Sequence, residues 1–261
     1  MTLAEYHAHP ALSRSRLWLL NKSPQKFKWE EEHPEPPTAA FRLGAAFHKL
    51  VLEPETFDEE YVGTPDFDKR TKDGKAMYNA FLEKAGSRTM LDYDEIQTII
   101  GMRKAVMENP TARVLIEKGL KEHSIFWKDK ETGIELKCRP DILLKDDVKV
   151  IVDLKSTISA DTKSFTSECI RYGYDVQSAW YKDGVQTEYP GEYSFIYIAV
   201  EKKPPYAVNV MEMDKLMIEY GYIRFRELLN TYIECQKSGN WYGYMGSDNI
   251  MNKIELPAWV E

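Results

Sequence analysis

Residues 134–155 constrain the fold of this chain more than any other segment, because they read as two hydrophobic strands joined by a polar turn. Side chains alternate between the two faces of a strand. One face of the first strand then carries four polar residues, namely Glu135, Lys137, Arg139 and Asp141. The other face carries Ile134, Leu136, Cys138, Ile142 and Leu144. On the second strand, Asp153 and Lys155 oppose Val150, Val152 and Leu154. Lys145, Asp146 and Asp147 supply the turn, so a β-hairpin is predicted.

Placing charges in such a hydrophobic strand costs desolvation energy unless they have a partner. In one interpretation, Asp153 and Lys155 are an ion pair on a solvated face. The second acid, Asp141, favours a different interpretation, a metal site. It follows Pro140 on the neighbouring strand and can meet Asp153 across the ladder. Two such carboxylates suit a hard divalent cation. The hairpin therefore suggests a magnesium-dependent nuclease.

Composition narrows the class of protein. The chain has 261 residues, 43% hydrophobic and 30% charged, as in an ordinary globular protein. No apolar run is long enough for a membrane span, so no membrane partner is expected. The three cysteines, Cys138, Cys169 and Cys235, are odd in number and widely spaced. This favours a reducing, cytoplasmic location over disulfides or an iron–sulfur cluster.

The net charge of −7 is unusual for an enzyme that acts on DNA, but affinity for nucleic acid depends on local basic surface. Basic residues gather in two segments, at 14–28 and at 69–75. Taken singly, each of these basic residues is explained equally well by a place on a solvated helix or loop as by a role in binding DNA. An acidic exterior around a basic channel would reconcile the charge with binding to DNA.

Hydrophobic periodicity predicts the other elements. Helices are expected at 13–21, from Ser23-Pro24 through Trp29, and at 41–53, 73–86, 92–109, 164–187 and 214–237. Strands are expected at 123–128, 134–144, 149–156, 194–200 and 206–212. An exposed loop over the site is expected at 62–75, and a tail with Trp241, Pro257 and Trp259 is expected to pack along the body. The prediction is one α/β domain over 1–261, mainly helical to about residue 120, with the sheet and a C-terminal helix after it.

The candidate site begins with the acids. Phosphodiester hydrolysis needs a positioned water and neutralisation of an anionic transition state, which two metal ions about 4 Å apart can provide. Asp141, Asp153 and the backbone carbonyl of Leu154 are the predicted ligands, and Lys155 would orient the water or stabilise charge.

Three further residues have weaker support from the sequence alone. His48 lies one turn after the small Gly44 and Ala45, which leaves room for a ligand, although a single helical histidine is usually structural. Gln177 and Tyr181 share a helix face at i and i+4. They either contact phosphate or the metal shell, or form an ordinary polar pair at the edge of a packed helix.

Together these segments resemble the PD-(D/E)XK nuclease superfamily, and specifically the RecE-type exonucleases (exonuclease VIII) of phages and prophages. The resemblance covers nearly the whole chain. It rests on five motifs: Tyr-His-Ala-His-Pro-Ala-Leu-Ser-Arg-Ser (6–15), Leu-Gly-Ala-Ala-Phe-His-Lys-Leu-Val-Leu-Glu-Pro-Glu (43–55), Cys-Arg-Pro-Asp (138–141), Val-Asp-Leu-Lys-Ser-Thr (152–157) and Tyr-Asp-Val-Gln-Ser-Ala-Trp-Tyr (174–181). RecB-like nuclease domains are similar in the histidine, the acids and lysine, and the Gln-x-x-x-Tyr helix.

The resemblance implies a mixed sheet flanked by helices, with Asp141, Asp153 and Lys155 as catalytic residues and His48 as a metal ligand. It implies a Mg²⁺-dependent enzyme, with Mn²⁺ as a substitute, that degrades one strand of linear double-stranded DNA from 5′ to 3′ and leaves a 3′ overhang. A homo-oligomeric ring, a trimer or tetramer, and a RecT-like single-strand annealing recombinase are the implied partners. Directionality requires a 5′-phosphate pocket, for which Ser13, Arg14 and Ser15 are candidates; Ser13 is as well explained as a helix cap.

Two other functions are compatible with parts of this pattern. An endonuclease of the same superfamily, acting on structured or specific DNA, would use the same hairpin chemistry. A DNA-binding module without catalysis would be expected to lack an acid or the lysine, and all three are present.

Overall fold

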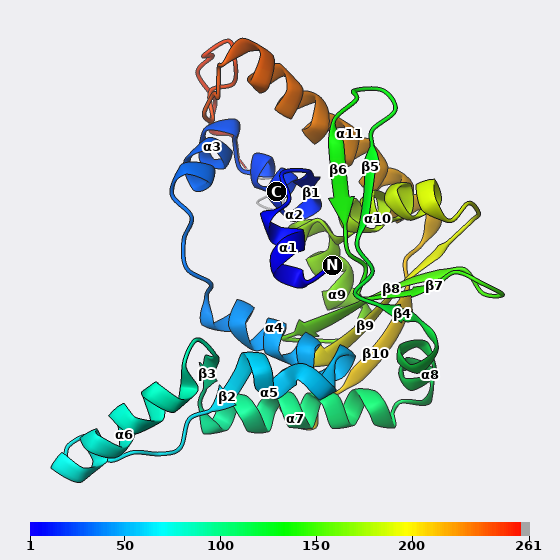
Figure 1. The fold of residues 1–261 in the computed structure, drawn as a ribbon. Helices are drawn as coiled ribbons and strands as arrows, with labels where there is room; N and C mark the ends of the chain where they lie inside the picture. Colours follow the sequence, from blue (N-terminus) through cyan, green and yellow to red (C-terminus); the bar gives the residue numbers. More distant parts are fainter. Residues whose placement is uncertain (257–261) are drawn as a thin grey trace.

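The structure, a computed structural model, describes residues 1–256 and centres on a mixed five-stranded sheet in the order β10-β9-β8-β7-β4 (Figure 1). The strands are β4 (Leu120–Lys121), β7 (Ile142–Leu144), β8 (Val150–Thr157), β9 (Ser194–Glu201) and β10 (Val208–Glu212). β8 and β9 run parallel, and the other neighbouring pairs are antiparallel. The predicted α/β fold with a central mixed sheet is therefore confirmed. Residues 257–261, including Pro257 and Trp259, lie outside the described chain.

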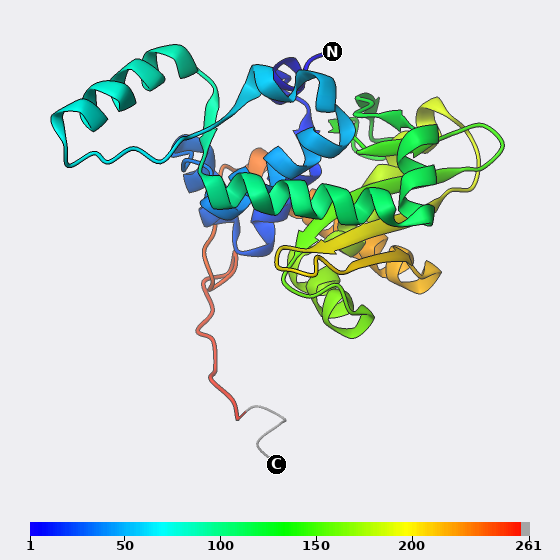
Figure 2. The ribbon, with the colours of Figure 1, turned by 90° about the horizontal axis from the view of Figure 1, so that it is seen from below.

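Helices cover both faces of this sheet (Figures 1 and 2). One layer consists of α4 (Ala39–Leu52), α7 (Tyr93–Glu108) and α8 (Pro110–Lys118). The other consists of α9 (Thr162–Tyr172), α10 (Tyr174–Glu188) and α11 (Lys215–Ser238). On β8, Val152 and Leu154 belong to the hydrophobic core under α4, α7 and α8, and Ile151 belongs to the core under α9, α10 and α11. This is the predicted alternation, and it places Asp153 on the α10 side of the sheet.

The N-terminal segment packs against a second, three-stranded sheet in the order β1-β6-β5. Its elements are α1 (Leu3–Ala8), β1 (Leu12–Ser13), α2 (Arg14–Trp18), a 3₁₀ turn (Leu19–Asn21) and α3 (Pro24–Glu32). β1 runs parallel to β6 (Glu135–Cys138), which pairs with β5 (Ile125–Lys128) in an antiparallel hairpin. The helix predicted at 13–21 is thus α2 with its 3₁₀ extension.

The strand predicted at 134–144 is wrong as one element, because the chain leaves one sheet and enters another at Arg139-Pro140-Asp141. Proline lacks an amide hydrogen and restricts the residue before it, so the ladder ends there. β6 joins the small sheet, and only β7 pairs with β8. The predicted hairpin survives in its second half, with Ile142 opposite Val152.

The single helix predicted at 164–187 is also wrong. It consists of α9 and α10, which are separated by Gly173 in the left-handed conformation, with φ of 69°. A Cβ atom at this position would approach the Trp18 ring to 2.6 Å. Glycine is therefore required both by the backbone turn and by the close contact with α2.

The segment between α4 and α7 begins and ends against the body of the molecule, and its middle part, the loop at 64–71 together with α6, projects as an arm (Figures 1 and 2). The segment contains a 3₁₀ turn (Pro54–Thr56), α5 (Phe57–Glu60), β2 (Tyr61–Gly63), α6 (Lys72–Ala85) and β3 (Thr89–Leu91). The loop predicted at 62–75 was expected to cover the site. Instead its ends belong to β2 and α6, and within the described chain none of residues 62–75 lines the cavity of the site.

Three remaining predictions concern the cysteines, the membrane and the tail. All three cysteines are buried and free. None of the helices in the described chain combines the length and apolarity needed to cross a bilayer. Trp241 stacks on Phe27 with ring centroids 5.3 Å apart, as the predicted packing of the tail requires. Residues 249–256, however, are exposed and extend away from the body (Figure 2).

Candidate active site

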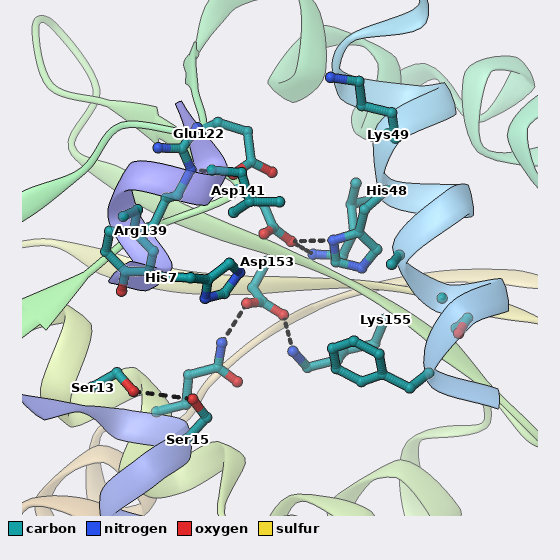
Figure 3. A pocket seen from close by; sticks show the side chains of 18 of the residues that line it. His7, Ser13, Ser15, His48, Lys49, Glu122, Arg139, Asp141, Asp153 and Lys155 are labelled. Atoms are coloured by element: carbon teal, nitrogen blue, oxygen red, sulfur yellow. Dashed lines mark hydrogen bonds and ion pairs between the residues drawn. The ribbon is translucent and has the colours of Figure 1, made fainter. Parts of the chain in front are cut away.

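A cavity of about 800 Å³ opens where the N-terminal segment, α4, the β7–β8 hairpin and α10 meet (Figure 3). It brings together nearly all of the predicted site residues from segments far apart in the sequence. Those that line it are Ser13, Ser15, His48, Asp141, Asp153, Leu154, Lys155, Gln177 and Tyr181. Arg14 lines a smaller adjoining cavity of about 180 Å³.

The two acids meet across the β7–β8 hairpin, as their positions in the sequence predict. Asp141 immediately precedes β7, and Asp153 lies within β8. The Oδ2 atom of Asp141 accepts a hydrogen bond of 2.7 Å from the amide of Leu154. Because this bond ties the first acid to the residue after the second, the hairpin itself fixes their relative positions.

Asp153 is the more buried acid, with 2% of its surface exposed. Its Oδ1 accepts a hydrogen bond from the Gln177 amide on α10, and its Oδ2 faces the Lys155 ammonium in an ion pair. The Lys155 ammonium is the only partner of Oδ2 among the described residues. Lys155 also lies over the ring of Tyr174, 4.7 Å from its centroid. The Asp153 carboxylate is thus held from two sides, by an amide from α10 and by an ammonium from its own strand.

His48 reaches the same acids from α4, with its Nδ1 atom 3.4 Å from Asp141 Oδ2. A Cβ atom on Gly44, one turn earlier, would lie 3.6 Å from Ser156 Oγ, in ordinary contact. The small residue lets α4 approach β8 closely enough for the imidazole to reach Asp141. The structure therefore places His48 beside the acids, and its role as a metal ligand stays a prediction.

The two acids differ in their affinity for a proton. Burial raises the pKa of Asp153, and the neighbouring Lys155 only partly offsets this effect. Burial acts on Asp141 too, but His48, Lys155 and the Leu154 amide together lower its pKa. Burial disfavours the His48 imidazolium, yet the Asp141 carboxylate raises the pKa of His48 overall. Asp141 and His48 therefore each favour the charged form of the other, whereas Asp153 is the acid more readily protonated.

The donor set of the site fits a hard cation. Within residues 1–256, no group of three His, Cys, Asp or Glu side chains is arranged to hold a metal ion. Mg²⁺ does not need such a group, because it keeps several waters and binds through one or two carboxylates and substrate phosphates. The Asp153 and Asp141 carboxylates and the Leu154 carbonyl, which lie together in the cavity lining, would provide oxygen ligands of that kind.

Two basic residues predicted to share a face with Asp141 are held apart from it by the break at Pro140. The Lys137 ammonium donates to the carbonyls of Tyr6 and His9, at 2.6 and 2.7 Å. Arg139 donates from Nε to Glu122, at 2.7 Å. Both line the cavity, but each is engaged with the protein itself.

Glu122 is a cavity residue that sequence reasoning missed. Its backbone is in the left-handed region, with φ of 52°, and its amide donates to the Asp141 carbonyl at 3.0 Å. Burial and the Asp141 carboxylate raise its pKa to about 7, against the ion pair with Arg139. No local pattern marks Glu122, because it lies in the turn between two short strands and meets Arg139 only after folding.

Ser13, Arg14 and Ser15 enter the site from the start of α2. The Ser13 hydroxyl caps α2 by accepting from the Arg16 amide, and it lies 3.2 Å from the Ser15 hydroxyl. Arg14 donates to the carbonyls of Tyr172 and Gly173 at the junction of α9 and α10. The capping role predicted for Ser13 is confirmed, and the helix has only five residues, so its amides form no separate anion site.

Comparisons with known proteins agree with this geometry. A family model described as a PDDEXK-like domain of unknown function (DUF3799) matches residues 13–253. No curated protein matches the sequence. A provisionally assigned exonuclease from Eubacterium rectale has a similar fold, with a TM-score of 0.68, 14% identity, and coverage of 98% of this chain and 96% of that chain. An alkaline exonuclease from Laribacter hongkongensis aligns at 16% identity over 88% of this chain and 92% of that chain, but its TM-score of 0.29 is too low to indicate a shared fold.

Proposed function

Because the chain belongs to the PDDEXK-like family DUF3799, we propose that it is a metal-dependent nuclease that hydrolyses phosphodiester bonds of DNA. More specifically, we propose a 5′-to-3′ exodeoxyribonuclease that acts on linear double-stranded DNA and leaves a 3′ overhang. The observation that carries the proposal is the meeting of Asp141, Asp153 and Lys155 in one cavity.

Each residue has a role in this proposal. Asp141, Asp153 and the Leu154 carbonyl would hold Mg²⁺, or Mn²⁺ in its place, with His48 as a further ligand; two ions per site are proposed. Bound metal supplies positive charge that neutralises the phosphate and stabilises the departing oxygen. Lys155 would orient the attacking water and help to remove its proton. Gln177 holds Asp153 through its hydrogen bond, and so fixes the direction of that carboxylate.

The smaller cavity supports the proposed direction of cleavage. It shares Lys155 and Tyr181 with the main cavity and is also lined by Ser13 and Ser15. Lys155 supplies an ammonium there, whereas the Lys137 ammonium donates to backbone carbonyls and contributes its charge. Hydroxyl groups and ammonium groups are suitable partners for a terminal phosphate. We therefore assign this cavity to the 5′-phosphate. Arg14 uses only its Nη2 atom for the Tyr172 and Gly173 carbonyls, and its Nε has no hydrogen-bond partner among the described residues, so the guanidinium would add both charge and a donor to this cavity.

The wider setting is proposed from the resemblance to RecE-type exonucleases. A ring of three or four copies would enclose the duplex, and a closed ring permits many cleavages for each binding event. A RecT-like annealing recombinase would act on the overhang in the cytoplasm. The buried, free cysteines agree with a reducing environment.

The proposal is tested by a time course on linear duplex DNA in Mg²⁺, with one end 5′-phosphorylated and each strand labelled separately. We expect progressive loss of the strand with the 5′ end and an intact complementary strand. Closed circular DNA serves as the control and should resist cleavage. Internal cuts at the same rate on circles would identify an endonuclease, and no cleavage in Mg²⁺ or Mn²⁺ would leave only a binding module.

A further inference from the structure

The N-terminal segment, residues 2–11, forms one wall of the cavity and contributes His7, a histidine of the motif at 6–15 to which no role has been assigned so far. Its helix α1 begins with a capping box, in which the Thr2 hydroxyl accepts from the Glu5 amide and the Glu5 carboxylate accepts from the Thr2 amide. Such a reciprocal pair fixes the start of a short helix. The family model begins only at Ser13, so this wall lies outside the matched region.

A buried lysine fastens the segment to the small sheet. Lys137 on β6 has 5% of its surface exposed, and its ammonium donates to the Tyr6 and His9 carbonyls at the C-terminal end of α1. Positive charge is favourable there, because carbonyl groups at a helix end lack partners. β1 then continues along β6, with Leu12 paired to Leu136. The segment is thus attached to β6 twice, through the Lys137 ammonium at Tyr6 and His9 and through strand pairing at Leu12.

This attachment directs the His7 side chain into the cavity, on the side opposite His48 (Figure 3). The ring makes an edge contact with Tyr6, with centroids 5.7 Å apart. Within residues 1–256 the imidazole makes no hydrogen bond, and the residue is exposed to the solvent of the cavity. A polar ring held at a defined place with its donor and acceptor free is suited to a ligand.

The electrostatic surroundings indicate an anionic ligand. Burial, then the charges of Lys137 and Arg139, lower the pKa of His7. A neutral imidazole still donates one N–H. The same two cations that disfavour a positive imidazole favour a negative group beside it.

We propose that His7 is a further substrate-contacting residue of this site, whose ring N–H donates a hydrogen bond to a phosphate oxygen of the strand held at Asp141 and Asp153. The inference rests on the proposed function, because it takes the substrate to be DNA. It assigns the N-terminal wall a direct role in positioning the phosphate between α1 and α4.

Three substitutions at His7 separate this role from packing. His7→Ala removes both ring and donor, His7→Phe keeps the aromatic contact with Tyr6 without a donor, and His7→Gln restores a donor without the ring. Binding is measured by fluorescence anisotropy of a 5′-phosphorylated duplex in Ca²⁺, and turnover in Mg²⁺. We expect the Ala and Phe variants to lose about 10- to 100-fold in binding or kcat/KM, the range for a hydrogen bond to a charged group, and Gln to recover part of it.

His33→Ala is the matched control, because that ring stacks on Trp29 with centroids 3.8 Å apart and does not line the cavity in the described chain. It should bind and cleave like the wild type, and all variants should unfold at similar temperatures. A His7→Phe variant with wild-type binding and turnover would overturn the inference, since packing alone would then suffice.

The two proposals fail in different ways. If the wild type binds DNA without cleaving it, the nuclease proposal fails, and weaker binding by His7→Ala still supports the contact. If the wild type cleaves DNA and the His7 variants match it, only the His7 inference fails. If the wild type does not bind DNA at all, both are overturned.

Discussion

At the scale of residues, the sequence could place the acids and the lysine of the site but not the contacts that hold them. Strand alternation was enough to place Asp153 and Lys155 on one face, and Asp141 next to them. It could not show that Gln177 holds one oxygen of Asp153, because that contact joins a strand to a helix 24 residues away. It could not reveal Glu122 or the orientation of His7 either. Glu122 depends on its ion pair with Arg139, and His7 depends on the attachment of its segment to Lys137, and both contacts form only on folding.

Glu122 provides a prediction about stability and pH. Its pKa is raised from 4.5 to about 7 in the folded protein. The folded state therefore holds this proton more tightly, so the stabilisation is complete below pH 4.5 and is lost as the pH rises to about 7. Glu122→Gln should flatten the fall in unfolding free energy across this window, as measured by urea denaturation at several pH values.

The control for this measurement is Glu83→Gln, because Glu83 is exposed on the projecting helix α6. That variant should keep the pH dependence of the wild type. An unchanged slope in Glu122→Gln would show that the carboxyl group does not hold a proton near pH 7 in the folded protein.

At the scale of elements, the sequence predicted most helices and strands but not where they break. Pro140 ends β6 and Gly173 separates α9 from α10, and both breaks lie inside hydrophobic patterns that continue without interruption. The breaks are needed by tertiary contacts: Asp141 must leave the small sheet to reach β8, and α10 must turn to bring Gln177 to Asp153. Periodicity reports local preference, so such contacts are invisible to it.

Gly173 gives a test at this scale. Gly173→Ala combines left-handed backbone strain with displacement of the Trp18 ring, which a Cβ would approach to 2.6 Å. We expect a loss of about 2–4 kcal/mol in the free energy of unfolding. Activity should fall as well, because α10 carries Gln177.

Gly239→Ala is the matched control, since Gly239 also ends a helix with φ of 71°, but no atom of residues 1–256 lies within 4 Å of a Cβ placed there. It should lose only about 1–2 kcal/mol, the cost of the backbone conformation. Equal losses in the two variants, measured by urea denaturation, would mean that the contact with Trp18 adds nothing.

At the scale of the whole molecule, the cavity differs in charge from the rest of the chain. The chain has 42 Asp and Glu against 35 Lys and Arg. The cavity is lined by six Lys and Arg (Arg16, Lys49, Lys137, Arg139, Lys155, Lys202) and five Asp and Glu (Glu53, Glu60, Glu122, Asp141, Asp153). The sequence suggested a basic interior, but it assigned this role partly to residues 69–75, which belong to the arm.

Binding of DNA should therefore depend strongly on salt despite the acidic total charge, because each phosphate contact releases counterions. Lys202→Ala, in the cavity lining, should reduce the slope of log Kd against log salt by about one. Lys69→Ala, which lies in the loop of the arm, should leave it unchanged. Equal slopes for the wild type and both variants would count against binding in this cavity.

If Asp141 and Asp153 form the metal-dependent centre for DNA hydrolysis that we propose, replacing Asp153 will remove the response of the protein to Mg²⁺. Cleavage of linear duplex DNA by the wild type and Asp153→Asn is followed as Mg²⁺ is added, together with the unfolding temperature of each protein. We expect Mg²⁺ to activate and stabilise only the wild type. The variant should stay folded, but its cleavage rate should fall by more than the roughly 100-fold typical of substitutions outside the metal-ligand shell. Cleavage by Asp153→Asn within a few-fold of the wild type, or by the wild type without any divalent cation, would contradict this proposal.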